Sequence, residues 1–178
     1  MDTCPDCGNS DMRVQIVAGA PVHECGLCGA RFGDRWAVEA IDDRDQARER
    51  GFDPAVWPLV RALEALPGLH VRDAHAGGLQ PPTLPFVELA GTDQRLLLQL
   101  ENLAKSLLLG AAAMRCHWIV EVEYRRHLAF VLKPRHAGGG IAPGTVRDAQ
   151  QDLGPLRRHL ERDARLGWWR HADDASNR

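Results

Sequence analysis

Leucine and valine recur every three or four residues in three parts of the chain, and this spacing predicts three core helices. The first would follow Asp53-Pro54, which supplies an N-cap and a proline at the first helical position, and Pro67-Gly68 would end it. The second would be capped by Thr92 and would end at Gly110. Their apolar stripes consist of Val56, Leu59, Val60, Leu63 and Leu66, and of Leu96, Leu100, Leu103 and Leu107.

The third helix would open at a capping box of Thr145 and Asp148. It would break or kink at Gly154-Pro155, because proline removes an internal hydrogen bond. Four short apolar runs predict strands, of which the last two form a hairpin; they cover 69–73, 84–90, 118–124 and 128–132. The resulting order, α-β-β-α-β-β-α, predicts an α+β domain of two layers, in which helices pack mainly on one face of an antiparallel sheet.

The N-terminal residues follow a different pattern, in which two Cys-x-x-Cys pairs flank a predicted pair of strands. Residues 12–17 alternate polar and apolar side chains, residues 18–21 contain turn formers, and residues 22–24 lead back to the second pair. Zn²⁺ prefers four soft ligands in a tetrahedron, and two residues between cysteines let one tight turn aim both sulfurs at the same point. The predicted ligands are Cys4, Cys7, Cys25 and Cys28.

This stretch resembles the zinc-ribbon families of transcription, translation and RNA-processing proteins. The resemblance favours a structural Zn²⁺, because a closed shell of four sulfurs leaves no position for water or substrate. Disulfides or a redox Cys-x-x-Cys are the alternative, but a redox motif would not need a second pair. We expect a zinc ribbon at 1–35, a charged helical connector at 36–50, the α+β domain at 51–171 and a disordered tail at 172–178.

Charge and hydropathy narrow the function classes. The formal net charge is −2, and residues 1–35 carry three arginines against five acids, so the ribbon lacks the basic face that phosphate contacts need. No apolar run approaches the roughly 18 residues of a membrane span, and no secretory signal is recognisable. We therefore expect a cytoplasmic protein without a membrane partner, and no feature indicates a small-molecule substrate.

Two loops share the sequence His-Ala-Gly-Gly, beginning at His75 and at His136. Such loops could flank one cleft and offer backbone N–H groups to an anion, or they could be mobile surface loops. Residues 63–78 resemble the wybutosine-synthesis group of tRNA-modifying methyltransferases, in which a helix ending in Leu-Pro-Gly precedes a strand and a Ser-Cys-x-Gly-His-like loop. In this chain residues 73–77 occupy the position of that motif but lack its cysteine. The resemblance therefore implies no catalytic residue here.

Basic residues gather near the ends of the predicted hairpin and could form one patch. With His75, the candidate contacts to a ligand or nucleic acid are Arg115, Arg125, Arg126, Lys133, Arg135 and His136. Basic groups beside aromatic ones, such as Trp118 and the pair Trp168-Trp169, can bind single-stranded RNA by neutralisation and stacking. In the alternative interpretation, the arginines are solvated turn residues and the tryptophans pack on the core.

These patterns favour a binding or adaptor protein that contains a zinc ribbon and contacts a protein or RNA partner. No nucleophile–base–acid pattern is recognisable in the sequence, which favours a protein without catalytic activity. Two alternatives stay open. One is an RNA-directed enzyme, of the tRNA-modification type, with a cleft between the His75 and His136 loops. The other is a subunit of a larger protein assembly.

Overall fold

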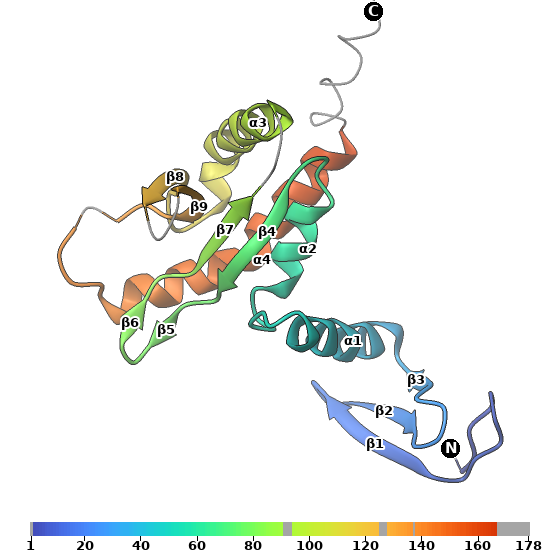
Figure 1. The fold of residues 1–178 in the computed structure, drawn as a ribbon. Helices are drawn as coiled ribbons and strands as arrows, with labels where there is room; N and C mark the ends of the chain where they lie inside the picture. Colours follow the sequence, from blue (N-terminus) through green and yellow to red (C-terminus); the bar gives the residue numbers. More distant parts are fainter. Residues whose placement is uncertain (1, 91–93, 125–127, 137, 167–178) are drawn as a thin grey trace, which may run out of the picture. The chain divides into compact units, whose positions relative to one another are not determined.

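A computed structural model describes residues 2–90, 94–124, 128–136 and 138–166, which form two compact units divided after Pro54 (Figure 1). The first unit holds an antiparallel sheet with the strand order β1-β2-β3 and one helix. Its elements are β1 (Met12–Val17), β2 (Ala20–Cys25), β3 (Arg31–Gly33) and α1 (Arg35–Glu49). Ala18 and Gly19 both have positive φ, the conformation of a two-residue hairpin turn. The predicted pair of strands between the cysteines is therefore confirmed.

Helix α1 packs on this sheet instead of being a solvated connector. Ala37 and Ile41 are fully buried with Ala20 and Val22 in a small core. The helix therefore belongs to the first unit, and the boundary between the units lies after Pro54 rather than after residue 35.

Arg31 joins the sheet to the helix through three carboxylates. Its Nε donates to Glu24 on β2 at 2.8 Å, while its two terminal nitrogens donate to Asp42 and Asp45 on α1 at 2.6 Å each. The hydrogen bond to Glu24, and then those to the two aspartates, raise the pKa of the Arg31 guanidinium. One guanidinium thus binds three carboxylates at once, and the cluster keeps a formal charge of −2.

The second unit contains a four-stranded antiparallel sheet with the order β4-β7-β9-β8. Its strands are β4 (His70–His75), β7 (Phe86–Ala90), β8 (Trp118–Tyr124) and β9 (Leu128–Pro134), with a small hairpin of β5 (Gly78–Leu79) and β6 (Pro82–Thr83). Its helices are α2 (Trp57–Glu64), α3 (Gln94–Gly110), which continues into η1 (Ala111–Ala113), and α4 (Pro143–Arg165). Apart from the small hairpin, the predicted order α-β-β-α-β-β-α is confirmed, as is the α+β class.

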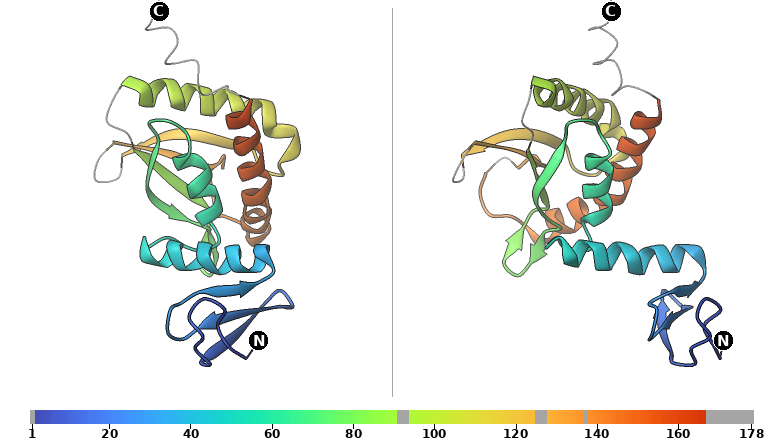
Figure 2. Two further views of the ribbon diagram at one scale, coloured as in Figure 1. Left: turned by 90° about the vertical axis from the view of Figure 1, so that its right-hand side faces the viewer. Right: turned by 45° about the vertical axis from the view of Figure 1, so that its right-hand side comes forward.

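The helices form one layer against the sheet (Figure 2). Helix α2 contacts β4 and α4, and α3 contacts β8 and α4, so the three helices share one core with the strands. Both predicted apolar stripes are buried throughout. The most deeply buried large side chains in this core include Leu59, Leu63, Leu103, Leu132, Leu156 and Leu160.

Several predicted helix boundaries are wrong. Helix α2 begins at Trp57 rather than at Pro54, and α4 begins at Pro143, so that Thr145 lies inside the helix and opens no capping box. Pro143 occupies the first turn, where its missing N–H has no helical partner to lose. Helix α4 is not interrupted at Pro155, since the buried residues on either side, Leu153 and Leu156, hold both halves on the core. The Thr92 cap lies outside the described residues.

One window of the described chain, Leu96–Ala113 in α3 and η1, is long and apolar enough to cross a membrane by length and composition. This window is not an unbroken apolar run, because it contains five polar residues, Gln99, Glu101, Asn102, Lys105 and Ser106. Core helices pass the same test, and 39% of this window is buried inside the structure. The inner face of α3 packs against β8 and α4, as in a core helix.

Substituting Arg31 tests its role between the sheet and α1. Arg31→Met should weaken the docking of α1 by about 1–2 kcal/mol, because hydrogen bonds to carboxylates are lost and partial exposure screens the charges. Amide hydrogen exchange in α1 should accelerate by roughly 5–30-fold. The control is Arg35→Met, which removes the exposed Arg35–Glu39 pair and should change exchange little. Equal exchange rates in wild type and Arg31→Met would contradict this role.

Candidate metal centre

The two cysteine pairs adopt the same backbone turn. Gly8 donates its N–H to the carbonyl of Cys4 at 2.8 Å, and Gly29 donates to the carbonyl of Cys25 at 3.0 Å. Each first cysteine donates its own N–H to the carbonyl five residues later, at 2.8 and 3.0 Å. Both glycines have a φ of 73°, in the left-handed region that glycine favours. The sequences Cys-Pro-Asp-Cys-Gly and Cys-Gly-Leu-Cys-Gly therefore fold into equivalent loops.

These loops bring four sulfur atoms together. The Sγ atoms of Cys4 and Cys28 are 3.7 Å apart, those of Cys7 and Cys25 are 3.6 Å apart, and all four lie within 4.8 Å of one another. A tetrahedron with Zn–S bonds of about 2.3 Å has an edge of about 3.8 Å, whereas a disulfide would need about 2.05 Å. All four thiols are free. The cysteines thus lie close enough to bind a metal ion, with the spacing of a four-sulfur shell.

Backbone hydrogen bonds favour the thiolate form of Cys25. The N–H of Cys28, followed by that of Leu27, lowers the pKa of Cys25 to about 6. The pKa of Cys7 is raised to about 12, because burial and the neighbouring thiols outweigh the N–H of Asn9, which lowers it. The metal ligand formed by a cysteine is its thiolate, so a metal ion would meet a ready ligand at Cys25 and would displace protons from Cys7 and Cys28, whose pKa values are raised.

Residues around the shell hold the second loop in place. Gly26 donates its N–H to the carbonyl of Asp11 at 2.8 Å, and a Cβ at Gly26 would lie 2.0 Å from an oxygen of the Asp11 side chain. The side-chain amide of Asn9 lies 3.8 Å from the sulfur of Cys25 and donates to it. Such outer contacts orient the ligands of a metal site.

The two His-Ala-Gly-Gly loops lie at the same end of the four-stranded sheet. His75 ends β4 and stacks on Phe86 of β7, with ring centroids 6.3 Å apart. His136 follows the end of β9, which is the strand on the other side of β7. Two strand spacings amount to about 10 Å, so the loops lie near enough to flank one cleft.

A cavity of about 310 Å³ opens beside the second loop. Phe86, Pro134 and Ile141 supply apolar walls, and Lys133 and His136 supply polar groups. His75 does not line this cavity, and its Nδ1 accepts a hydrogen bond from the N–H of Gly77 at 2.8 Å. The structure therefore places His136, but not His75, in the lining of this cavity.

The basic residues of the hairpin are partly neutralised. Lys133 forms ion pairs with both Glu121, at 2.7 Å, and Glu123. Burial lowers the pKa of Lys133, but the hydrogen bonds to the two glutamates outweigh it, so the pKa is raised. Arg115 pairs with Asp148 at 3.4 Å. Of the other candidates, Arg135 is exposed, while Arg125 and Arg126 lie outside the described residues.

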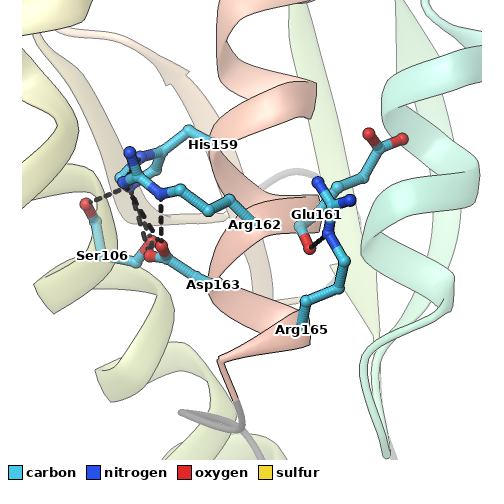
Figure 3. A network of polar contacts seen from close by, with 6 residues as sticks. All are labelled: Ser106, His159, Glu161, Arg162, Asp163 and Arg165. Carbon is cyan, nitrogen blue, oxygen red and sulfur yellow. Dashed lines mark hydrogen bonds and ion pairs between the residues drawn. The ribbon is translucent and has the colours of Figure 1, made fainter.

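Serine, histidine and aspartate do meet in the second unit, but as a buried link between α3 and α4 (Figure 3). Ser106 Oγ donates to Asp163 at 2.6 Å and lies 3.0 Å from His159 Nε2, while Arg162 lies 2.7 Å from His159 Nδ1. A catalytic serine needs access to substrate and a base that takes its proton. Ser106 is 0% exposed and its hydroxyl already bonds to the carboxylate, so the group fastens two helices together.

Asp152 is a further buried polar residue that the sequence analysis missed. Its carboxylate accepts the backbone N–H groups of Arg115 and Cys116 at 2.9 and 2.8 Å, and the indole N–H of Trp118 at 3.2 Å. It thereby ties the start of β8 to α4. One signal was present in the sequence: Asp152, His159 and Asp163 share the helical stripe of Leu156 and Leu160, where apolar residues are expected.

Removing a ligand should abolish metal binding. Purified wild-type protein should contain one metal ion per chain, whereas Cys25→Ser should bind with an affinity reduced by more than the roughly 10–100-fold typical of outer-shell changes. Cys116→Ser, which alters the remaining cysteine, serves as the control and should keep full occupancy. Elemental analysis and native mass spectrometry provide the measurement. Full metal content in Cys25→Ser would refute the assignment of ligands.

Removing the Ser106 hydroxyl should destabilise the second unit. Ser106→Ala removes the hydrogen bond that the hydroxyl donates to the buried Asp163 carboxylate, while His159 keeps its contact with the Ser106 backbone carbonyl. A lost hydrogen bond to a charged group costs about 1–3 kcal/mol. Denaturant unfolding of the full chain measures the loss. Ser10→Ala, an exposed serine in the first unit, should stay within about 0.5 kcal/mol of wild type. Unchanged stability of Ser106→Ala would show that the network contributes nothing.

No family model, no curated protein and no solved structure matches the chain. The likeness of residues 63–78 to the wybutosine-synthesis group therefore gains no support from these comparisons. The four-sulfur cluster is compatible with a zinc ribbon on its geometry alone.

Proposed function

We propose that the protein is a non-catalytic adaptor whose first unit is a zinc ribbon and which acts by binding a protein partner. The observation that carries this proposal is the four-sulfur cluster of Cys4, Cys7, Cys25 and Cys28. Four protein ligands complete the tetrahedral shell of a structural zinc ion, so none of its positions is left for water or substrate. The metal would stabilise the fold, and the unit would act by binding a partner instead of by catalysis.

The choice of zinc follows from the ligands and from the small core. Thiolates select soft metals, and a tetrahedral shell of four sulfurs suits Zn²⁺ or iron. The hydrophobic cluster of the first unit consists of four buried residues, Ala20, Val22, Ala37 and Ile41, around which Val17 and Val38 pack. A core of this size cannot hold a fold alone, and zinc binding contributes on the order of 10–16 kcal/mol in small zinc peptides.

Charge favours a protein partner over RNA. The first unit carries six arginines against eleven acids, a formal charge of −5 before the metal centre is counted. Arg31 is already bound by three carboxylates. Binding to phosphates depends on free cations, and an acidic surface instead suits a partner with a basic face.

The second candidate is the RNA-directed enzyme, which the cavity at His136 favours. Two loops at one end of the sheet and a cavity of about 310 Å³ are the setting such a site needs. Lys133, the cation of this cavity, is paired with two glutamates. Lys133 therefore attracts an RNA phosphate more weakly than an unpaired lysine would.

The proposal is tested by measuring metal, RNA and protein binding on the same full-length preparation. The metal should be zinc, and Co²⁺ substitution should give the absorption of a tetrahedral thiolate site. Fluorescence anisotropy with single-stranded and hairpin RNA should show no binding tighter than the non-specific range of about 10⁻⁶–10⁻⁴ M at physiological salt. A protein captured by wild type should rebind after purification, weaken as salt rises, and fail to bind Cys25→Ser.

Three results would overturn the proposal. Tight, salt-dependent RNA binding would favour the RNA-directed alternative, above all if His136→Ala weakened it. Turnover of an RNA substrate that survives in Cys25→Ser would make the protein an enzyme with an incidental metal centre. A partner that binds wild type and Cys25→Ser equally would remove the ribbon from recognition.

A further inference from the structure

Helix α3 has two apolar faces. The inner face is buried in the second unit and contains Leu96, Leu100, Leu103 and Leu107. The outer face contains Leu97, Leu98, Leu108 and Leu109, whose exposed fractions are 64%, 38%, 68% and 64%. A rotation of about 100° per residue places these two sets on opposite sides of the helix. The outer leucines form two pairs, one near each end of the helix, and exposed apolar residues that share one helix face mark an interaction surface.

The rotation of α3 about its own axis is fixed by polar contacts on the inner face. Ser106 bonds to Asp163 and His159 of α4, and all three side chains are buried. His159 also packs over Gly110, where a Cβ would lie 2.6 Å from the ring nitrogen. Turning α3 to hide its outer leucines would break this network and bury its inner leucines less. The outer face is therefore a fixed feature of the folded unit.

The outer face is self-complementary in sequence. Leu97 and Leu109 lie equally far from Leu103 on either side, and so do Leu98 and Leu108. Glu101 and Lys105 are also symmetric about the same residue, and they lie on the outer face between the leucine pairs. A second copy of α3 running antiparallel would therefore set leucines against leucines and each glutamate against the lysine of the other copy.

The charged pair is able to exchange partners. Glu101 and Lys105 form an ion pair within α3 at 2.6 Å, and their side chains are 58% and 62% exposed. An antiparallel second copy would bring two such pairs together with alternating sign, which is the charge complementarity expected across a two-fold interface. A lipid surface fits less well, because amphipathic membrane helices carry many basic residues and this face has only Lys105.

We propose that the outer face of α3, defined as Leu97, Leu98, Glu101, Lys105, Leu108 and Leu109, is a homodimer interface. Two copies of the chain pack through it with their α3 helices antiparallel, about a two-fold axis close to Leu103. A 17-residue helix is about 25 Å long, so the contact is smaller than the roughly 800 Å² per partner of a standard interface. The dimer should therefore dissociate on dilution in the micromolar range.

Analytical ultracentrifugation of the full chain across a concentration series tests the proposal. Wild type should convert from monomer to dimer as its concentration rises. Leu108→Glu should weaken association at least tenfold, because the two-fold axis places the new charge in the interface twice. Leu79→Glu alters a leucine of β5 whose exposure, 38%, equals that of Leu98. This control should dimerise like wild type.

Charge reversal distinguishes this arrangement from other contacts. In Glu101→Lys, a lysine would face a lysine at each of the two contacts beside the two-fold axis. In Lys105→Glu, a glutamate would face a glutamate at the same two contacts. Each variant should therefore dimerise more weakly than wild type. Mixing the two variants should restore dimers, because every pair across the mixed interface is then of opposite sign. A change in folding within one chain would not be rescued by mixing.

The remaining outcomes contradict the proposal. A wild-type chain that is monomeric at all concentrations up to several hundred micromolar would refute the homodimer. A dimer that Leu108→Glu leaves intact would place the interface elsewhere. Co-sedimentation of wild type, but not Leu108→Glu, with vesicles of phosphatidylethanolamine and phosphatidylglycerol, without dimers in solution, would assign the face to a lipid surface instead. None of these results bears on the zinc ribbon, so the two proposals fail independently.

Discussion

The close grouping of four cysteine sulfur atoms is the constraint on which the first unit depends. Its two cysteine loops are built alike, each closed by the N–H of a glycine with the same φ. Four buried core residues could not hold three short strands and a helix by themselves. A metal ion bound by the two loops would therefore fix the chain just before β1 and at the end of β2. Arg31 then attaches α1 to this frame through three carboxylates.

The second unit depends on apolar burial, and buried polar groups fix the register between its parts. Helix α4 supplies these groups on the same stripe as its leucines. Asp152 anchors the start of β8, and His159 and Asp163 anchor α3 through Ser106. Such groups are costly to bury unless satisfied, so their pairing selects one arrangement of the helices among several that would bury equal apolar area.

The two units differ in how they are stabilised, and they also present different surfaces. The first unit is acidic and would gain much of its order from a metal ion held by its four cysteines, and its acidity suits recognition by charge. The second unit presents an apolar helix face that is fixed by contacts on the opposite side of the same helix. In the functions proposed above, one surface would serve a basic partner and the other a second copy of the chain.

The sequence by itself determined the four-cysteine cluster, the order of the elements and the buried stripes of α2 and α3. Each of these depends on local spacing, which is two residues between the cysteines of a turn and three to four residues along a helix. Only the tertiary structure decided that α1 belongs to the ribbon, that α4 runs uninterrupted through Pro155 and that Lys133 is neutralised. These features depend on partners distant in sequence, such as the carboxylates that meet Arg31. Local propensity cannot reveal them, since burial against a distant element outweighs a cap or a single proline.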